Sequence, residues 1–156
     1  MVAWGFLPGR DAFPRAREAA NRALELDPLS LIVLAHLGWF LPVDKQLEYY
    51  KKILEMDSEF QPAQNYLANA YFVKGKYDKA FDIYEKLDRQ PQIGDIYIKT
   101  KKISEARQIL NKLLENPTQF PDSCGIARLC FLLGKKNEGF EWLEKACEDK
   151  NRLYWG

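Results

Sequence analysis

The chain has 156 residues, of which 47% are hydrophobic and 29% are charged. This length suits one ordinary domain or a short array of repeats, and the composition is typical of a folded chain rather than a disordered one. The 23 basic and 22 acidic residues leave a formal net charge of +1, so no overall field favours nucleic acid or an anionic membrane as a partner.

No segment of the sequence predicts a membrane helix or a signal peptide. The longest apolar run covers residues 31–41 and is interrupted by His36, whereas a spanning helix needs about 20 apolar residues. Residues 1–10 lack a basic stretch followed by an apolar one. The cysteines are odd in number and lack CxxC spacing, which predicts buried free thiols in a reducing compartment and a cytoplasmic location. They are Cys124, Cys130 and Cys147.

In chain order, five segments repeat one pattern, in which a lead residue is followed by apolar residues four and seven positions later. Such offsets keep all three residues on one face of a helix. The lead residue is small in four of the five segments. The lead residues are Ala16, Gln46, Ala80, Ala106 and Gly139. Each segment is therefore predicted to be the second helix of a hairpin.

A different pattern precedes each of the last four segments and predicts the first helix of the hairpin. It consists of an apolar residue, a small residue, and a larger residue three positions further on. The four examples are Leu37-Gly38-Leu41, Leu67-Ala68-Tyr71, Ile93-Gly94-Tyr97 and Ile126-Ala127-Cys130. We predict an all-α chain of about ten helices and no sheet, in which the small residues of the paired helices meet so that the backbones approach closely.

Turn signals separate the predicted helices. Gly75 and Gly134 stand where a first helix would end, and glycine suits that position. Asp27-Pro28, Asp57-Ser58 and Asn116-Pro117 lie between the hairpins and are typical of helix ends.

These residues resemble the tetratricopeptide repeat family. Residues 66–84 resemble a complete repeat, and Leu26-Asp27-Pro28 is similar to the proline that closes a repeat. The resemblance implies a right-handed superhelix, or solenoid, of antiparallel helix hairpins and a single repeat domain over residues 1–156. Its parts would be a partial repeat over 1–28 and repeats over about 31–58, 61–88, 90–117 and 120–150. The close spacing of the third and fourth lead residues predicts a short helix over residues 92–99.

The ends of the chain resemble the repeat arrays that follow signalling or DNA-binding domains in bacterial regulators. The aromatic residues near the ends would cap such an array poorly. They are Trp4, Phe6, Tyr154 and Trp155. Three interpretations stay open: the array continues in a longer chain, it self-associates through its ends, or these aromatics fold back on the terminal helices.

No pattern in the sequence indicates an enzyme or a cofactor. His36 is the one histidine, and it lacks the second histidine one turn away that a helical zinc site needs, so a structural or surface role is expected. The cysteines have no activating base in their segments, and no glycine-rich phosphate loop is present. We expect no metal ligands, no catalytic residues and no nucleic-acid or membrane partner.

A protein or peptide partner is therefore the expected ligand, and the resemblance implies that it lies in a concave groove lined by the first helices. The residues assigned to that groove come from the second, fifth, ninth, twelfth and thirteenth positions of each repeat. They are Pro62, Asn65, Asn69, Phe72, Val73, Asp95, Ile98, Lys99, Cys124, Arg128, Phe131 and Leu132. Asn65 and Asn69 are one turn apart, so their amides could grip a peptide backbone or a carboxylate. The alternative function is a regulatory or sensor array within a larger signalling or transcription-regulating protein.

Overall fold

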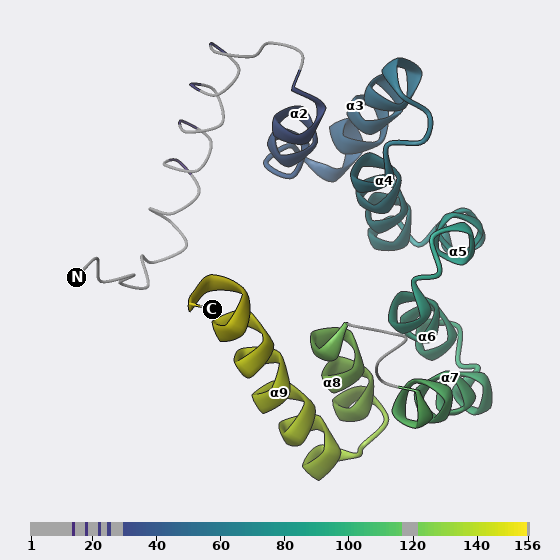
Figure 1. Cartoon of the computed structure of the whole chain (residues 1–156). Coiled ribbons are helices and arrows are strands. Elements are labelled where there is room, and N and C mark those ends of the chain that lie inside the picture. The colour runs from purple at the N-terminus through teal and green to yellow at the C-terminus, as the bar shows by residue number, and fades with distance from the viewer. Residues whose placement is uncertain are drawn as a thin grey trace. The chain divides into compact units, whose positions relative to one another are not determined.

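A computed structural model of the chain describes residues 30–116 and 122–155, with side chains as far as Glu148, and four isolated positions, Pro14, Glu18, Arg22 and Glu25. The two continuous ranges contain eight helices and no strand (Figure 1). The prediction of an all-α chain without a sheet is confirmed for these ranges. The helix predicted around Ala16 lies outside the continuous ranges.

The helices follow one another along the chain with short connections (Figure 1). Their bounds are α2 Leu31–Gly38, α3 Val43–Met56, α4 Gln61–Val73, α5 Tyr77–Lys86, α6 Gln90–Lys99, α7 Ile103–Glu115, α8 Ser123–Leu132 and α9 Lys136–Trp155. The predicted short helix over 92–99 is α6, which begins two residues earlier because Pro91 occupies its first turn, where proline's missing N–H is not needed.

Two compact units make up the fold, Met1–Ala80 and Phe81–Gly156. The boundary falls inside α5, so each unit holds one part of that helix. That residues 1–156 form a single repeat domain stays a prediction.

In the first unit, α3 packs on α4, and both contact α2. Tyr50 of α3 is fully buried and stacks on Tyr66 of α4, with the ring centroids 5.5 Å apart. Ala35, Ala63 and Ala68 are fully buried in the same unit. The small side chains allow close helix contact, and the tyrosines fill the space beside them.

Gln46 occupies the position of a small lead residue in α3. Its side-chain Nε2 donates hydrogen bonds to the backbone oxygens of Leu41, at 2.9 Å, and Trp39, at 3.3 Å. Both carbonyls belong to the connection between α2 and α3. The longer side chain therefore ties down this connection, whereas the sequence pattern alone would suggest a looser hairpin.

In the second unit, α6 packs on α7, α8 on α9, and α8 contacts both α6 and α7. The core is a cluster of five fully buried side chains from α7 and α8, on which Ile98, Ile109 and Trp142 pack. Its members are Leu110, Leu113, Ile126, Leu129 and Cys130. The apolar line of α7 is thus covered by the first helix of the following hairpin.

The sequence pattern predicted that the glycines on the helices meet small residues. Their nearest neighbours in the structure are large side chains instead. A methyl group on Gly38 would lie 2.6 Å from the ring of Tyr50 and 2.7 Å from that of Tyr49. On Gly94 it would lie 2.9 Å from the methyl carbons of Leu129 in α8. Each glycine therefore receives a large side chain instead of a small one.

Four helix ends use a left-handed residue to close the last turn. Gly75 and Gly134 have φ angles of 71° and 82°, as expected from their places in the sequence. Asp88 and Lys101 adopt the same conformation, with φ angles of 50° and 62°, which costs a residue with a side chain about 1–2 kcal/mol. After Lys101, the N–H of Lys102 donates a hydrogen bond to the backbone oxygen of Tyr97 at 2.8 Å. The helix end that usually contains a left-handed glycine therefore forms here with a lysine.

Adding a methyl group at Gly38 tests the ring contact. Gly38→Ala is expected to lower the free energy of unfolding by about 1–3 kcal/mol, because the two tyrosine rings must shift. Urea denaturation gives this value, with Ile32→Ala, at an exposed side chain of the same helix, as the control that changes little. An unchanged midpoint for Gly38→Ala would contradict the contact.

Replacing Lys101, whose φ is positive, tests how much its conformation costs at the end of α6. Lys101→Gly is expected to raise the free energy of unfolding by about 0.5–1 kcal/mol, because glycine adopts a positive φ without steric cost. The control is Lys99→Gly, at the last residue of α6, which should lower stability by up to about 1 kcal/mol. Thermal melts of both variants make the comparison, and a loss of stability at position 101 would refute the expectation.

Candidate peptide-binding surfaces

The first unit exposes an aromatic surface formed by α2 and α4, which lie in contact. Trp39 directly follows α2, is 52% exposed, and meets Tyr66 edge to face with 5.6 Å between ring centroids. His36 contacts the same tyrosine ring at 6.0 Å. Ile32, also exposed, lies one turn before His36, and the spacing of these residues keeps them on one side of the helix. We call Ile32, His36, Trp39 and Tyr66 the aromatic surface.

His36 is held by its own helix. Its Nδ1 atom lies 2.6 Å from the backbone oxygen of Ile32, and since a carbonyl oxygen can only accept, Nδ1 carries the proton. In the neutral ring Nε2 is then an acceptor. The aromatic surface therefore combines two large aromatic rings with an imidazole nitrogen that can accept a hydrogen bond.

The groove residues predicted on α4 have different degrees of burial. Asn65 and Asn69 are half-buried, Phe72 is half-buried against the ring of Tyr77 at 5.6 Å, and Val73 is exposed. The side-chain oxygen of Asn65 is enclosed and has no hydrogen-bond partner among the described residues. These side chains flank Tyr66 along the same helix.

One ion pair holds the end of α4. Lys74, which caps α4, pairs with Asp44 in the first turn of α3. A carboxylate is favoured at the start of a helix and a cation at the end of one. The pair therefore joins the two helix ends that carry the complementary partial charges.

In the second unit, the predicted groove residues Asp95 and Arg128 bind one another. The Arg128 Nη2 atom lies 2.7 Å from Asp95 Oδ2, and Nε donates to Oδ1 at 3.3 Å. Asp95 comes from α6 and Arg128 from α8. The carboxylate side chain is 15% exposed and the guanidinium side chain 46%. Arg128 is thus partly engaged within the chain, and its exposed part remains available to a partner.

Burial governs the ionisation of this pair. It raises the pKa of Asp95, while the charges of Arg128 and Lys99 oppose the rise. Tyr84 of α5 is nearly fully buried, and burial together with the charge of Asp95 raises its pKa as well. The pair therefore brings a carboxylate and a guanidinium together beside a buried phenol.

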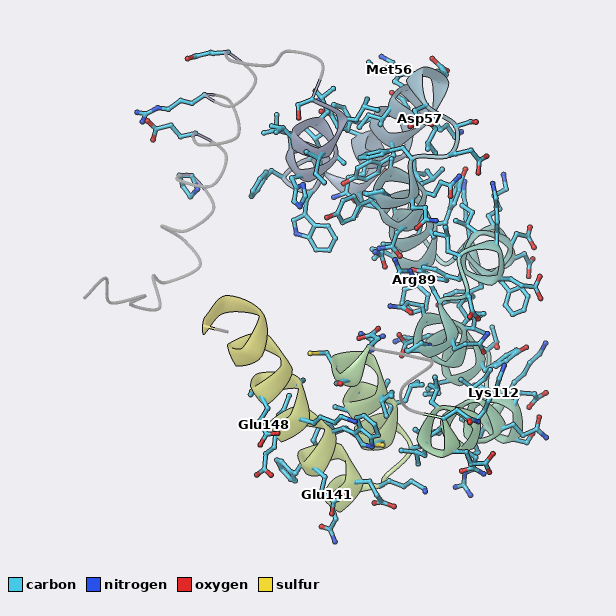
Figure 2. The ribbon with its side chains drawn as sticks, in the orientation of Figure 1. Met56, Asp57, Arg89, Lys112, Glu141 and Glu148 are labelled. Carbon is cyan, nitrogen blue, oxygen red and sulfur yellow. The ribbon has the colours of Figure 1, made fainter. Side chains whose placement is uncertain are left out.

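Further polar groups precede Asp95 at the start of α6 and lie at the start of α8. Gln92 Nε2 donates to Asp122 Oδ2 at 3.4 Å, and the other oxygen of Asp122 caps α8 by accepting from the Gly125 N–H at 2.8 Å. Gln92 Oε1 and Arg89 Nε are enclosed without a hydrogen-bond partner in the described part of the chain. Arg89 lies at the start of α6 (Figure 2).

The remaining predicted residues of the second unit differ in their availability. Lys99 is exposed, whereas Ile98 is half-buried against the core cluster. Phe131 is partly exposed and packs its ring against Phe140 of α9, 5.1 Å away. The predicted groove residues thus fall into two sets, one on α4 and one on α6 and α8, and their joining into one continuous groove stays a prediction.

Sequence reasoning missed the aromatic surface. Trp39 occupies the ninth position of the repeat over 31–58, the same position as Asn69 in the following repeat, so the positional rule could have found it. The surface role expected for His36 agrees with its exposure. The prediction of buried cysteines is wrong for two of the three, because Cys124 and Cys147 are exposed. Their places on the solvent sides of α8 and α9 follow from packing that composition does not reveal.

Neither a metal cluster nor a membrane span is found among the described residues. No three histidine, cysteine or acidic side chains gather there in a way that could hold a metal ion. No helix in that part of the chain is both long and apolar enough to cross a bilayer.

Removing Arg128 tests the buried charge. Arg128→Met should lower the free energy of unfolding by about 1–3 kcal/mol at pH 7, because Asp95 then remains ionised without its counter-charge. Asp95→Asn in addition should restore most of the loss. Lys135→Met, which breaks an exposed pair with Glu138, is the control and should cost less than about 0.5 kcal/mol.

The loss in Arg128→Met should depend on pH. Because burial raises the pKa of Asp95 above its ordinary value of 3.8, the folded chain binds this proton more tightly than the unfolded chain, and stability falls as the pH rises through that range. Without Arg128 the pKa rises further. Urea melts should show a smaller penalty at pH 4 than at pH 7, and an equal penalty at both would contradict the pairing.

The comparisons with known proteins agree with this architecture. Residues 92–117 match the family model of the tetratricopeptide repeat, and no curated protein sequence matches the chain. Among solved structures, MamA is 20% identical with a TM-score of 0.52, over 92% of each chain.

Two further structures are similar. YrrB, described as a TPR protein with an unusual peptide-binding site, is 23% identical with a TM-score of 0.52, over 85% of this chain and 75% of its own. A tetratricopeptide repeat protein from Parabacteroides merdae is 20% identical with a TM-score of 0.51, over 87% of this chain and 59% of its own. The chain therefore has the all-α hairpin fold of tetratricopeptide repeat solenoids.

Proposed function

We propose that the protein is a non-enzymatic interaction module that binds a peptide or an extended segment of a protein, and that the aromatic surface is its anchoring site. The observation that carries the proposal is Trp39, which leaves half of its large side chain exposed while its ring packs on Tyr66, the ring that His36 also contacts. Tryptophan is among the residues that contribute most to binding energy at interfaces. A positioned ring also loses little conformational entropy when a partner binds.

The chemistry of this surface favours a partner with an apolar or aromatic side chain. Such a side chain would bury apolar area against Trp39 and Ile32, at roughly 25 cal/mol per Å². Asn65 and Asn69 on α4 could then bond to the backbone of the partner. The peptide-binding site that the description of YrrB reports supports this class of ligand.

The second unit offers a different chemistry to a partner. Lys99 and the exposed part of Arg128 supply cationic donors, which suit an acidic side chain or a carboxylate. A cytoplasmic location and the absence of nucleic-acid, membrane and cofactor binding belong to the same proposal. A regulatory or sensor role within a larger protein stays a prediction, because no described contact favours it over partner binding.

Peptide selection tests the proposal even though the natural partner is unidentified. A phage-displayed library of random peptides is selected on the immobilised full chain, and the enriched peptides are synthesised and titrated by fluorescence anisotropy. Trp39→Ala should weaken their binding by at least about tenfold, as for a central anchoring residue.

The matched control is Met56→Ala. Met56 is as exposed as Trp39, at 55% against 52%, but lies at the end of α3 (Figure 2). It should leave affinity unchanged, and circular dichroism should show that both variants stay folded. The proposal fails if no peptide is enriched, or if the enriched peptides bind Trp39→Ala as well as the parent chain.

A further inference from the structure

His36 gives the aromatic surface a defined hydrogen-bonding character. Its Nδ1 atom donates to the backbone oxygen of Ile32 at 2.6 Å, so the neutral ring keeps its other nitrogen, Nε2, as an acceptor. The His36 side chain is exposed, and no residue in the described ranges bonds to Nε2. The imidazole therefore offers a partner one acceptor and has no second N–H to donate.

This acceptor lies between two exposed apolar side chains. Ile32, His36 and Trp39 follow one another at spacings of four and three residues, which keeps them on one side of the helix. Ile32 and Trp39 are each 52% exposed, and His36 and Trp39 both contact the ring of Tyr66. A side chain that contacts both Ile32 and Trp39 therefore spans His36 and displaces water from Nε2.

We infer that tryptophan is the side chain by which a bound peptide anchors on the aromatic surface, an assignment that rests on the peptide binding proposed above. The indole ring buries a large apolar area, and its N–H is a donor with no acceptor beside it. The ring packs on Trp39 and Ile32, while the N–H donates to Nε2 of His36. Both the apolar and the polar parts of the surface are then satisfied by one side chain.

Other side chains match this surface less well. A phenylalanine or a leucine would cover Nε2 without a donor, and an acceptor that loses water without a new partner weakens binding. A carboxylate brings acceptors alone and meets no free N–H on the imidazole. Lysine and arginine bring donors, but the four residues of the aromatic surface include no carboxylate to pair with their charge.

Replacing one group of the peptide tests the hydrogen bond. Peptides selected on the full chain should contain a recurring tryptophan. Each is then synthesised again with benzothienylalanine, in which sulfur replaces the indole N–H in a ring of similar shape. Fluorescence anisotropy at about pH 8, where an imidazole is neutral, should show binding weakened by about threefold to tenfold, as for the loss of one neutral hydrogen bond.

The His36→Phe variant tests whether His36 is the acceptor. Phenylalanine keeps a ring beside Tyr66 and removes both nitrogens, so the tryptophan and benzothienylalanine peptides should bind this variant with equal affinity. The matched control is Ile32→Ala, which removes an exposed apolar contact from the same side of the helix. It should weaken both peptides by the same factor, and circular dichroism checks that both variants are folded.

Three results overturn the inference while Trp39→Ala still weakens binding, so that the proposed peptide binding stands. The selected peptides lack a recurring tryptophan, or the benzothienylalanine peptide binds the parent chain as tightly as its tryptophan counterpart, or the exchange weakens binding to His36→Phe as much as to the parent chain. If no peptide is enriched at all, the proposed function and the choice of tryptophan fail together.

Discussion

Coverage of one helix by the next along the chain is the constraint on which the fold depends. Each amphipathic helix has an apolar stripe that it cannot bury alone, and a single hairpin leaves one side of its second helix open. In the second unit, α8 closes the open side of α7 and completes the core cluster. Stability in such an array comes from contacts between neighbouring helices along the chain.

This constraint also determines which surfaces are free for function. The second helices use their apolar lines for packing, and their remaining faces are dominated by charged residues. The first helices leave one side free of the core, and that side carries Trp39 in the first unit and the Asp95–Arg128 pair in the second. The two units therefore present different chemistry from the same structural position.

The sequence predicted the helices well because the helical period repeats in every segment. It predicted contacts less well, since a pattern gives the face on which a residue lies but not the size of the side chain opposite. Gly38 illustrates this difference, because it receives two tyrosine rings rather than a small partner. The cysteines illustrate it as well, since only Cys130 reaches the core.

For the candidate site, position within the repeat is more informative than residue type. Asp95 and Arg128 both occupy groove positions of the repeat, and the structure brings them together. Trp39 occupies an equivalent position, but its residue type alone is equally compatible with a place in the core. Its contact with Tyr66 depends on how α2 meets α4, which no single segment of the sequence specifies.

The Asp95–Arg128 pair has a consequence for the alignment of the helices. Apolar stripes resemble one another from turn to turn, so packing alone discriminates weakly between two helices that match and two that have slipped by one turn. Asp95 and Arg128 are 33 residues apart, the same interval as Ala106 and Gly139, and they meet only in the matched arrangement. A slip would leave a carboxylate buried without its counter-charge, which is strongly unfavourable. The pair therefore favours a single register of α6 against α8.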